Sequence, residues 1–264
     1  MYATTYHRPA SVDEAVKLAS EEAKYLSGGQ TLLPTMKQRL AAPSDLIDLR
    51  HIDALKGISV DGKHVRIGAA CTHNEIANSD AISAVCPGFT YLAGHIGDPA
   101  VRHMGTIGGS IANNDPAADY PAALLALGAT ITTNSRTLSA EEFFTGMFET
   151  ALEEGEMVTA VEFDAPEKSG YAKFRNPASR YAMTGVFVCK GADGSVGVGV
   201  AGAGADGAFR SPEMESALAS NFAASALEGI SIDPSGLMTD MHASAEYRAN
   251  LIKVMGKRAV EQAG

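Results

Sequence analysis

The chain has 264 residues, of which 45% are hydrophobic and 20% charged, with a formal net charge of −10. This length allows two compact domains, while the acidic balance without a basic patch argues against a nucleic-acid-binding surface. The longest clean apolar run, residues 122–127, is too short to span a membrane. Because the N-terminus also lacks the apolar core of a signal peptide, we expect a soluble, cytoplasmic protein.

The first fifty residues predict a small βαβ-type unit. Residues 11–22 carry the periodicity of an amphipathic helix, with Ser11 as its N-cap and Glu14 placed as in a capping box. The other elements expected here are a short strand and turn, a short helix and a second strand, at residues 24–29, 30–40 and 45–49.

The middle of the chain predicts a hairpin followed by helices. Asp61-Gly62 lies between two apolar runs within residues 57–70, which is a strong hairpin signal. Further helices are expected at residues 72–85, 88–97, 120–127 and 136–148, and a strand at residues 155–165.

The last hundred residues predict a second α+β domain. Residues 165–170 form a polar connector that contains Pro and Gly, which is typical of a domain boundary. Three apolar-alternating strands are expected beyond it, at residues 171–175, 181–191 and 195–204, and then helices at 212–220 and 242–263. A run of strands before a run of helices favours a sheet covered on one face.

The cysteines and histidines limit the metal chemistry that the chain can perform. Cys71, Cys86 and Cys189 include no Cys-x-x-Cys pair, and their odd number argues against a disulfide framework. An iron–sulfur cluster normally takes four thiolates, so the chain cannot build an all-cysteine cluster alone. The seven histidines lack zinc-ligand spacing, so we expect no metal-ligating residues.

Two glycine pairs with similar neighbours are the main functional signal. Gly28-Gly29 belongs to the first glycine segment (residues 26–31) and Gly108-Gly109 to the second glycine segment (residues 106–110); both contain hydroxyl side chains. Consecutive amides in a Gly-rich turn bind phosphate oxygens where Cβ atoms would obstruct them, and a following helix adds partial positive charge. One pair alone favours a plain turn, but two such pairs indicate a shared dinucleotide diphosphate site.

Other motifs carry weaker signals. The formal Gly-x-Gly-x-x-Gly at Gly197, Gly199 and Gly202 alternates with valines and does not open a helix, so we interpret it as a thin strand packed against another backbone rather than as a nucleotide fingerprint. No Walker sequence occurs. Asp119 stands where a helix N-cap is expected, and Lys173 lies on an alternating strand whose lysines are usually solvated.

Lone histidines and aromatics are assigned structural roles. His73 and His95 have no partner in view and are expected at the surface or satisfied in the core, and Arg102 and His103 are likewise taken as structural. Tyr181 could stack on a ligand, but an aromatic residue at the start of a buried strand is the more common arrangement. No catalytic acid, base or nucleophile is apparent.

Four segments together resemble a known family: SGGQTLLPTMKQR, VRHMGTIGGSIANNDPAADYPA, GYAKFRNPASRYAMTGV and HASAEYRANLIKVMGKRA. They resemble the flavin-binding medium subunit of the molybdenum hydroxylases, in particular that of carbon-monoxide-dehydrogenase-like enzymes, over nearly the whole chain. The resemblance implies an α+β fold with a PCMH-type FAD-binding region at 1–165, in subdomains of about 1–55 and 56–165. A C-terminal α+β domain at 170–264, with a three-stranded antiparallel sheet and helices on one face, would follow.

The resemblance also implies which residues bind FAD. The first glycine segment would wrap the diphosphate with the amides of Gly28 and Gly29, and the second would hold its other side. Asp119 would contact the hydroxyl-bearing part of the cofactor, and Lys173 would reach back to the flavin region. The complete implied set is Leu26, Ser27, Gly28, Gly29, Gln30, Thr31, Thr106, Ile107, Gly108, Gly109, Ser110, Asp119 and Lys173.

The function implied is that of an oxidoreductase subunit that transfers electrons through FAD. Its partners would be a large subunit with a molybdenum cofactor and a small subunit with [2Fe-2S] clusters, in a dimer of heterotrimers. Electrons would pass from the clusters to FAD and on to an external acceptor. Two alternatives stay open: a free-standing FAD-dependent dehydrogenase or oxidase, and a non-enzymatic nucleotide-binding module.

Overall fold

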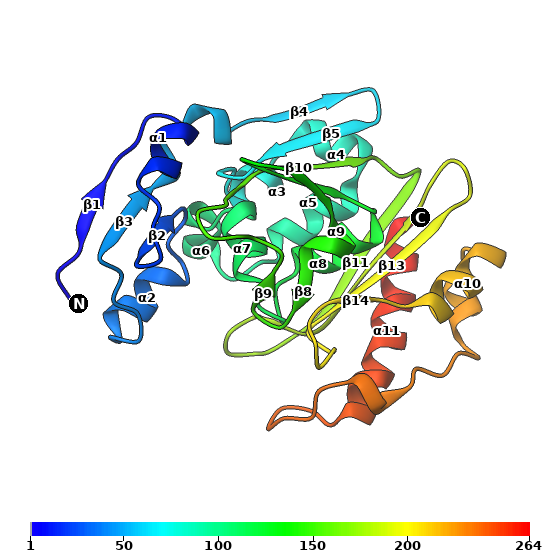
Figure 1. The fold of residues 1–264 in the computed structure, drawn as a ribbon. Helices are drawn as coiled ribbons and strands as arrows, with labels where there is room; N and C mark the ends of the chain where they lie inside the picture. The colour runs from blue at the N-terminus through cyan, green and yellow to red at the C-terminus, as the bar shows by residue number, and fades with distance from the viewer. Residues whose placement is uncertain (1) are drawn as a thin grey trace.

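A computed structural model describes residues 2–264, and Figure 1 shows the N-terminal unit set beside the rest of the molecule. The N-terminal sheet is parallel, with strand order β1-β3-β2. Its elements are β1 (Thr5–His7), α1 (Val12–Lys17), β2 (Ala23–Leu26), α2 (Leu32–Lys37) and β3 (Asp45–Asp48). The predicted βαβ unit is thus confirmed, and β1 is an additional strand that the sequence did not indicate.

Helix α1 is shorter than predicted. It ends at Lys17, because residues 20–23 turn back through a hydrogen bond from Ala23 N to Ser20 O. Ser11 caps it as expected, accepting from Glu14 N at 3.2 Å. The Glu14 carboxylate, however, accepts from Ala10 N rather than from Ser11 N, so the capping box is shifted by one residue.

The middle sheet is antiparallel, in the order β4-β5-β10-β6-β7. These strands are β4 (Ile58–Asp61), β5 (His64–Gly68), β6 (Thr130–Thr133), β7 (Thr137–Ser139) and β10 (Val158–Asp164). The β4–β5 hairpin is confirmed, but Asp61 pairs with His64, so its turn is centred on Gly62 and Lys63, one residue later than expected. Between β7 and β10, the chain also forms a two-stranded hairpin of β8 (Phe144–Gly146) and β9 (Glu149–Thr150).

Short helices lie between these strands in the sequence. They are α3 (His73–Ala77), α4 (Asp80–Val85), α5 (Pro87–Gly94), α6 (Pro99–Met104), α7 (Ile107–Asn113), α8 (Tyr120–Ala126) and α9 (Ala140–Phe143). The helix predicted at 72–85 is divided because the Ser79 hydroxyl caps a new helix by accepting from Ile82 N. The helix predicted at 136–148 is largely wrong: residues 137–139 pair with β6, and only α9 is helical.

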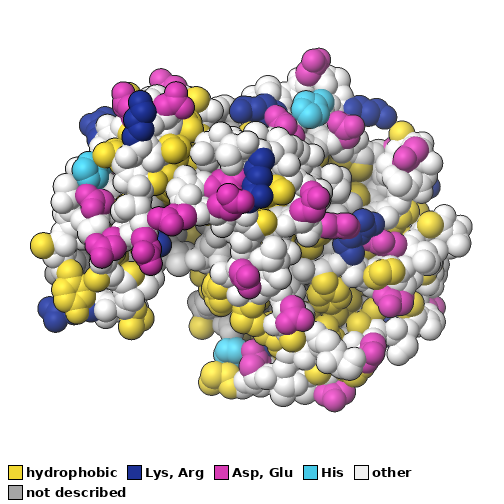
Figure 2. Space-filling model, in the orientation of Figure 1, with side chains coloured by type: hydrophobic (Ala, Val, Ile, Leu, Met, Phe, Trp, Pro, Cys, Tyr) yellow, Lys and Arg dark blue, Asp and Glu magenta, His cyan; other side chains and the backbone are white. Residues whose placement is uncertain are grey.

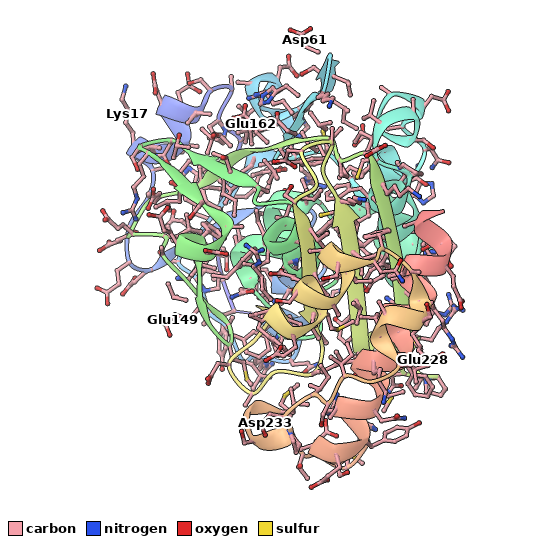
Figure 3. All side chains as sticks on the ribbon, turned by 90° about the vertical axis from the view of Figure 1, so that its right-hand side faces the viewer. Lys17, Asp61, Glu149, Glu162, Glu228 and Asp233 are labelled. Atoms are coloured by element: carbon pink, nitrogen blue, oxygen red, sulfur yellow. The ribbon has the colours of Figure 1, made fainter. Side chains whose placement is uncertain are left out.

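The C-terminal sheet is antiparallel, in the order β11-β12-β13-β14. Its elements are β11 (Lys168–Arg175), β12 (Ala182–Lys190), β13 (Val196–Ala201), β14 (Phe209–Arg210), α10 (Pro212–Ser220) and α11 (Ala245–Ala263). The predicted sheet of three strands gains the two-residue β14 at its edge. Figure 3 shows α10 and α11 lying over this sheet.

Helices cover both faces of this sheet, and not one as predicted. Alternate residues of a strand point to opposite faces, and Val198 and Val200 pack with α10 and α11. Gly197 and Gly199 face α8, where a Cβ atom would collide with a carbonyl oxygen of the helix. The interpretation of this glycine motif as a thin strand packed on another backbone is therefore confirmed.

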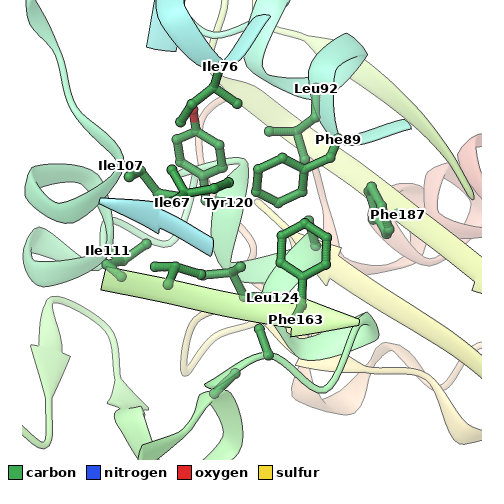
Figure 4. Packing of buried hydrophobic residues seen from close by; sticks show 14 of the residues in the cluster. Ile67, Ile76, Phe89, Leu92, Ile107, Ile111, Tyr120, Leu124, Phe163 and Phe187 are labelled. Atoms are coloured by element: carbon green, nitrogen blue, oxygen red, sulfur yellow. The ribbon is translucent and has the colours of Figure 1, made fainter. Parts of the chain in front are cut away.

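The largest apolar cluster lies under the middle sheet and continues into the C-terminal sheet. Figure 4 shows Phe89, Tyr120, Phe163 and Phe187 within it. The chain leaves the middle sheet at Asp164 and enters the C-terminal sheet at Lys168, inside the predicted connector. Because both sheets contribute to one cluster, the division into domains 1–165 and 170–264 stays a prediction. Within residues 2–264, no helix is both long and apolar enough to cross a membrane.

Candidate functional site

A cavity of about 960 Å³ lies where the N-terminal unit meets the rest of the molecule. In Figure 2 the surface is hollowed between these two parts. The cavity is lined by the loop after β2, the loops before α6 and α8, the start of α7 and the loop between β11 and β12. Its volume is at the upper end of the ~300–1,000 Å³ usual for ligand sites, which suits a large ligand.

The two glycine segments meet at this cavity. The Ser27 and Thr106 hydroxyl oxygens are 2.8 Å apart and hydrogen bonded. The Gly28 backbone packs so closely on residues 104–105 that a Cβ atom at position 28 would overlap the Met104 carbonyl oxygen. Gly28 is therefore required for close approach of two backbones, and the segments form one continuous wall.

The first glycine segment presents free amides. The backbone N–H groups of Gly28, Gly29, Gln30 and Thr31 donate to no acceptor in residues 2–264. Gly29 has φ +70°, a conformation that favours glycine, and α2 begins directly after Thr31 without a side-chain cap. Consecutive free N–H groups at a cavity are an anion-binding arrangement, and they need a partner from outside the protein.

The second glycine segment differs from the prediction. Gly108 and Gly109 lie in the first turn of α7, not in an open turn. Their amides are already used: Gly108 N donates to Ala69 O at 2.9 Å and Gly109 N to the Thr106 hydroxyl at 3.1 Å. Ile107 N and Ser110 N are bonded as well. The expectation that both segments offer amides is therefore wrong for the second one.

What the second segment offers to the cavity is hydroxyl groups. The Ser110 hydroxyl has no hydrogen-bond partner within the described chain, and the Thr106 hydroxyl lies at the seam with Ser27. Gly108 packs against Ala69, the residue after β5, because a Cβ atom at position 108 would be 2.6 Å from the Ala69 Cβ. The segment is a rigid wall held by the core rather than a donor loop.

Most of the predicted site residues line the cavity, but two do not. Those that line it are Leu26, Ser27, Gly28, Gly29, Gln30, Thr31, Thr106, Gly108, Gly109, Ser110 and Asp119. Ile107 is fully buried in the main apolar cluster. Lys173 also lies outside the lining and is only 5% exposed, unlike the solvated lysines usual on such strands, and its contact with the flavin region stays a prediction.

Lys173 and Asp119 form a buried ion pair beside the cavity. Lys173 Nζ donates to Asp119 Oδ1 at 2.8 Å and to His95 O at 2.9 Å. Asp119 also accepts from the Tyr171 hydroxyl. It stands at the N-cap position of α8 as predicted, but its side chain makes no capping bond. The pair therefore fixes the Asp119 carboxylate at the cavity wall and ties the loop after α5 to β11.

Three cavity residues were not assigned a site role from the sequence. Tyr181 precedes β12 and is 53% exposed, so its side chain is only partly buried. Burial raises its pKa, with Asp115 and Asp119 adding to the effect, and burial likewise raises the pKa of Asp115. His73 is buried at the start of α3, and burial together with Arg102 lowers its pKa to about 4. A lone histidine after a strand gives no sequence signal for such a position.

The three cysteines have the burial typical of unreactive thiols. All three are buried, and burial raises the pKa of Cys86 to about 11 and that of Cys189 to about 12. In the part of the chain that the structure describes, no group of three or more His, Cys, Asp or Glu residues is arranged to hold a metal ion.

Comparison with known proteins identifies a matching family and relatives of nearly equal length. The family described as "FAD binding domain in molybdopterin dehydrogenase" matches residues 2–166. The nicotine 6-hydroxylase medium subunit of Paenarthrobacter nicotinovorans is 35% identical, covering 99% of this chain and 98% of the relative. The carbon monoxide dehydrogenase medium chain of Afipia carboxidovorans is 36% identical, covering 98% and 96%.

Solved structures agree with these relatives. Reconstituted CO dehydrogenase from Oligotropha carboxidovorans matches with a TM-score of 0.86 and 34% identity, over 99% of this chain and 97% of the other. Quinoline 2-oxidoreductase from Pseudomonas putida 86 matches with a TM-score of 0.87 and 28% identity, over 99% and 96%. The similarity therefore extends through the C-terminal sheet, beyond the region that the family covers.

Proposed function

Because the chain belongs to the family of FAD-binding domains of molybdopterin dehydrogenases, we propose that it receives electrons from partner iron–sulfur clusters through FAD and passes them to an external acceptor. It is an FAD-binding medium subunit of the molybdenum hydroxylase type, and hence an oxidoreductase subunit. The proposal adds the direction of electron flow and the assignment of the cavity as the cofactor site.

The observation that carries the assignment is the row of free amides in the first glycine segment. Gly28 to Thr31 present four N–H donors without protein acceptors at a cavity of about 960 Å³. Hydroxyls of Ser27, Thr106 and Ser110 add polar groups to the same wall. A diphosphate bridge requires several donors at close range, so the residues present fit a dinucleotide.

Asp119 and Lys173 have different roles in this proposal. Asp119 lines the cavity, which supports a role in accepting hydrogen bonds from a hydroxyl-bearing part of the cofactor. Lys173 is a positioning residue, because it holds the Asp119 carboxylate without lining the cavity. The flavin ring supplies the redox chemistry when it is bound, and the chain supplies position and electrostatics.

The partners follow from what this chain lacks. Its buried, separated cysteines offer no cluster ligands within residues 2–264. Iron–sulfur clusters and a molybdenum cofactor would therefore be carried by a small and a large subunit. Relatives matched almost end to end are named as a medium subunit or medium chain, which favours a complex over the free-standing dehydrogenase or oxidase.

A titration of the purified chain with flavins tests the site. We expect FAD to bind at least tenfold more tightly than riboflavin, which lacks the diphosphate, and we expect ADP to compete with FAD. Equal affinities for FAD and riboflavin would contradict the amide cradle. Flavin fluorescence at equilibrium measures both affinities.

Purification from the native host tests the assembly. Recovery of the chain together with subunits that contain iron and molybdenum is the expected result. A solitary chain that oxidises a substrate and thereby reduces its own bound FAD, without these metals, would instead support the free-standing alternative.

A further inference from the structure

His73 is a buried side chain whose two ring nitrogens face different surroundings. It is 4% exposed and lies at the first position of α3, which is fixed by a capping box between Thr72 and Glu75. Its backbone N–H donates to Gly105 O at 2.9 Å, one residue before the second glycine segment. The ring thus lies between the main core and the cavity, which it helps to line.

The core side of the ring is bound to Tyr120. His73 Nδ1 and the Tyr120 hydroxyl are 3.1 Å apart, and this is the one hydrogen bond that the structure gives the phenol. Tyr120 is fully buried, and burial holds its pKa well above the usual value. A buried hydroxyl donates its proton where an acceptor is present. Tyr120 therefore donates to Nδ1, and the proton of the neutral ring resides on Nε2.

The cavity side of the ring is open. His73 Nε2 has no hydrogen-bond partner among the described residues, although the side chain is almost wholly buried. The space beside it is kept free by Gly105: a Cβ atom at that position would be 2.6 Å from Nε2. Nε2 itself remains accessible to solvent, because Arg248 Nε is the one buried side-chain N or O atom without a partner among residues 2–264. A ligand that displaced solvent from Nε2 without offering an acceptor would leave this N–H unpaired, at a cost of about 1–3 kcal/mol, so the geometry favours an acceptor on the cavity's ligand.

We propose that His73 donates a hydrogen bond from Nε2 to an acceptor atom of the bound FAD, with Tyr120 as the positioning residue that fixes the ring's tautomer. The inference rests on the proposed function, because it requires that FAD occupies this cavity. The donor is neutral, since burial and the nearby Arg102 guanidinium keep the ring unprotonated at pH 7. His73 therefore selects for a hydrogen-bond acceptor without adding charge.

Two substitutions of His73 test the donor role. His73→Phe keeps an aromatic ring but removes the donor, and we expect FAD affinity to fall about tenfold. His73→Gln places an amide N–H₂ near the position of Nε2, and we expect it to retain affinity within about threefold. Thermal unfolding without FAD shows whether each variant is folded. If both folded variants bind FAD as tightly as the wild type, the proposal is overturned.

The tautomer can be measured without any cofactor. In the protein free of FAD at pH 7, ¹⁵N chemical shifts of the His73 ring should show the proton on Nε2. Tyr120→Phe removes the donor to Nδ1, and we expect the shifts to move toward a mixture of the two tautomers. A wild-type ring protonated on Nδ1 would overturn the proposal independently of any binding result.

These measurements separate the two levels of inference. If the wild type binds FAD no better than riboflavin, the proposed function fails and the role of His73 fails with it. If the wild type binds FAD and His73→Phe, shown to be folded, binds it equally well, only the role of His73 is refuted.

Discussion

The two glycine segments border the same cavity, yet their backbones are in opposite states. In the first segment the amides of Gly28 to Thr31 have no protein acceptor. In the second, the amides from Ile107 to Ser110 are all bonded to the protein. The same pattern of paired glycines and hydroxyls thus produces a donor cradle in one place and a packed wall in the other.

The difference arises from what each segment packs against. The first segment follows an edge strand of a small sheet and rests on the rest of the molecule mainly through Gly28. The second packs against Ala69, the residue after β5, which approaches Gly108 and accepts its N–H. A glycine that allows close packing and a glycine that opens a backbone to a ligand are indistinguishable in sequence. Four experiments compare the two segments directly.

The largest expected effect is on the stability of the wall. Gly108→Ala would place a Cβ atom 2.6 Å from the Ala69 Cβ and 2.7 Å from the Ala69 carbonyl oxygen, and we expect the free energy of unfolding to fall by about 3 kcal/mol. Chemical denaturation without FAD measures this loss. Gly109→Ala is the matched control: its Cβ would be 3.0 Å from the Thr106 hydroxyl and 3.8 Å from Ser27, so its unfolding free energy should change by less than about 1 kcal/mol.

The second largest expected effect is a loss of stability at low pH, which arises from His73 next to the second glycine segment. Its folded pKa of about 4 is below the ~6.5 of an unfolded histidine, so the unfolded chain binds the proton more readily. The stabilising contribution is therefore complete above about pH 6.5 and is lost as the pH falls toward 4, by up to about 3 kcal/mol. Between pH 7 and 4, the unfolding free energy from chemical denaturation should depend less steeply on pH in His73→Phe than in the wild type. Identical pH dependences would contradict this assignment.

Displacement of the first glycine segment should weaken FAD binding. Gly28→Ala would push the first segment away from the Met104 carbonyl, and we expect FAD affinity to fall about tenfold, or ~1.4 kcal/mol. Gln30→Ala is the control, since the exposed side chain is removed and the backbone N–H remains. Equilibrium titration should find Gln30→Ala within twofold of the wild type; comparable losses in both variants would refute the backbone cradle.

The smallest expected effect is at the seam between the two segments. A double-mutant cycle with Ser27→Ala and Thr106→Ala should give a coupling of about 1 kcal/mol in unfolding free energy. Thr106→Ala alone also removes the N-cap of α7, at a cost of about 1 kcal/mol. The cycle cancels that cost, and a coupling near zero would show that the 2.8 Å contact does not bind the segments together.

Local sequence patterns predicted much of the fold. The hairpin of β4 and β5, the strands β10 to β13 and the helices α10 and α11 are where turn residues and periodicity placed them. Patterns failed where partners distant in the chain decide the structure. Residues 137–139 pair with β6 although the segment looks helical, and β1 forms only because β3 lies beside it.

The site was predicted as a set of segments rather than as a geometry. The convergence of Ser27 and Thr106 was expected and is present. The burial of Lys173 was not, because its partner Asp119 is 54 residues away and the packing of α8 against the C-terminal sheet brings them together. His73 could not be found from the sequence, since its environment is built by Tyr120 and Gly105 from other elements.

The glycines of β13 have a mechanical consequence. With Gly197 and Gly199 seated against the carbonyls of α8, sliding of the C-terminal sheet along that helix is blocked by backbone collision. Helix α8, the C-terminal sheet and the cavity wall at Asp119 must therefore move together as one rigid body. If the cavity opens to admit a bulky ligand, the part that moves is instead the N-terminal unit, whose apolar clusters are small and separate. We expect deuterium uptake in the absence of FAD to be fastest there.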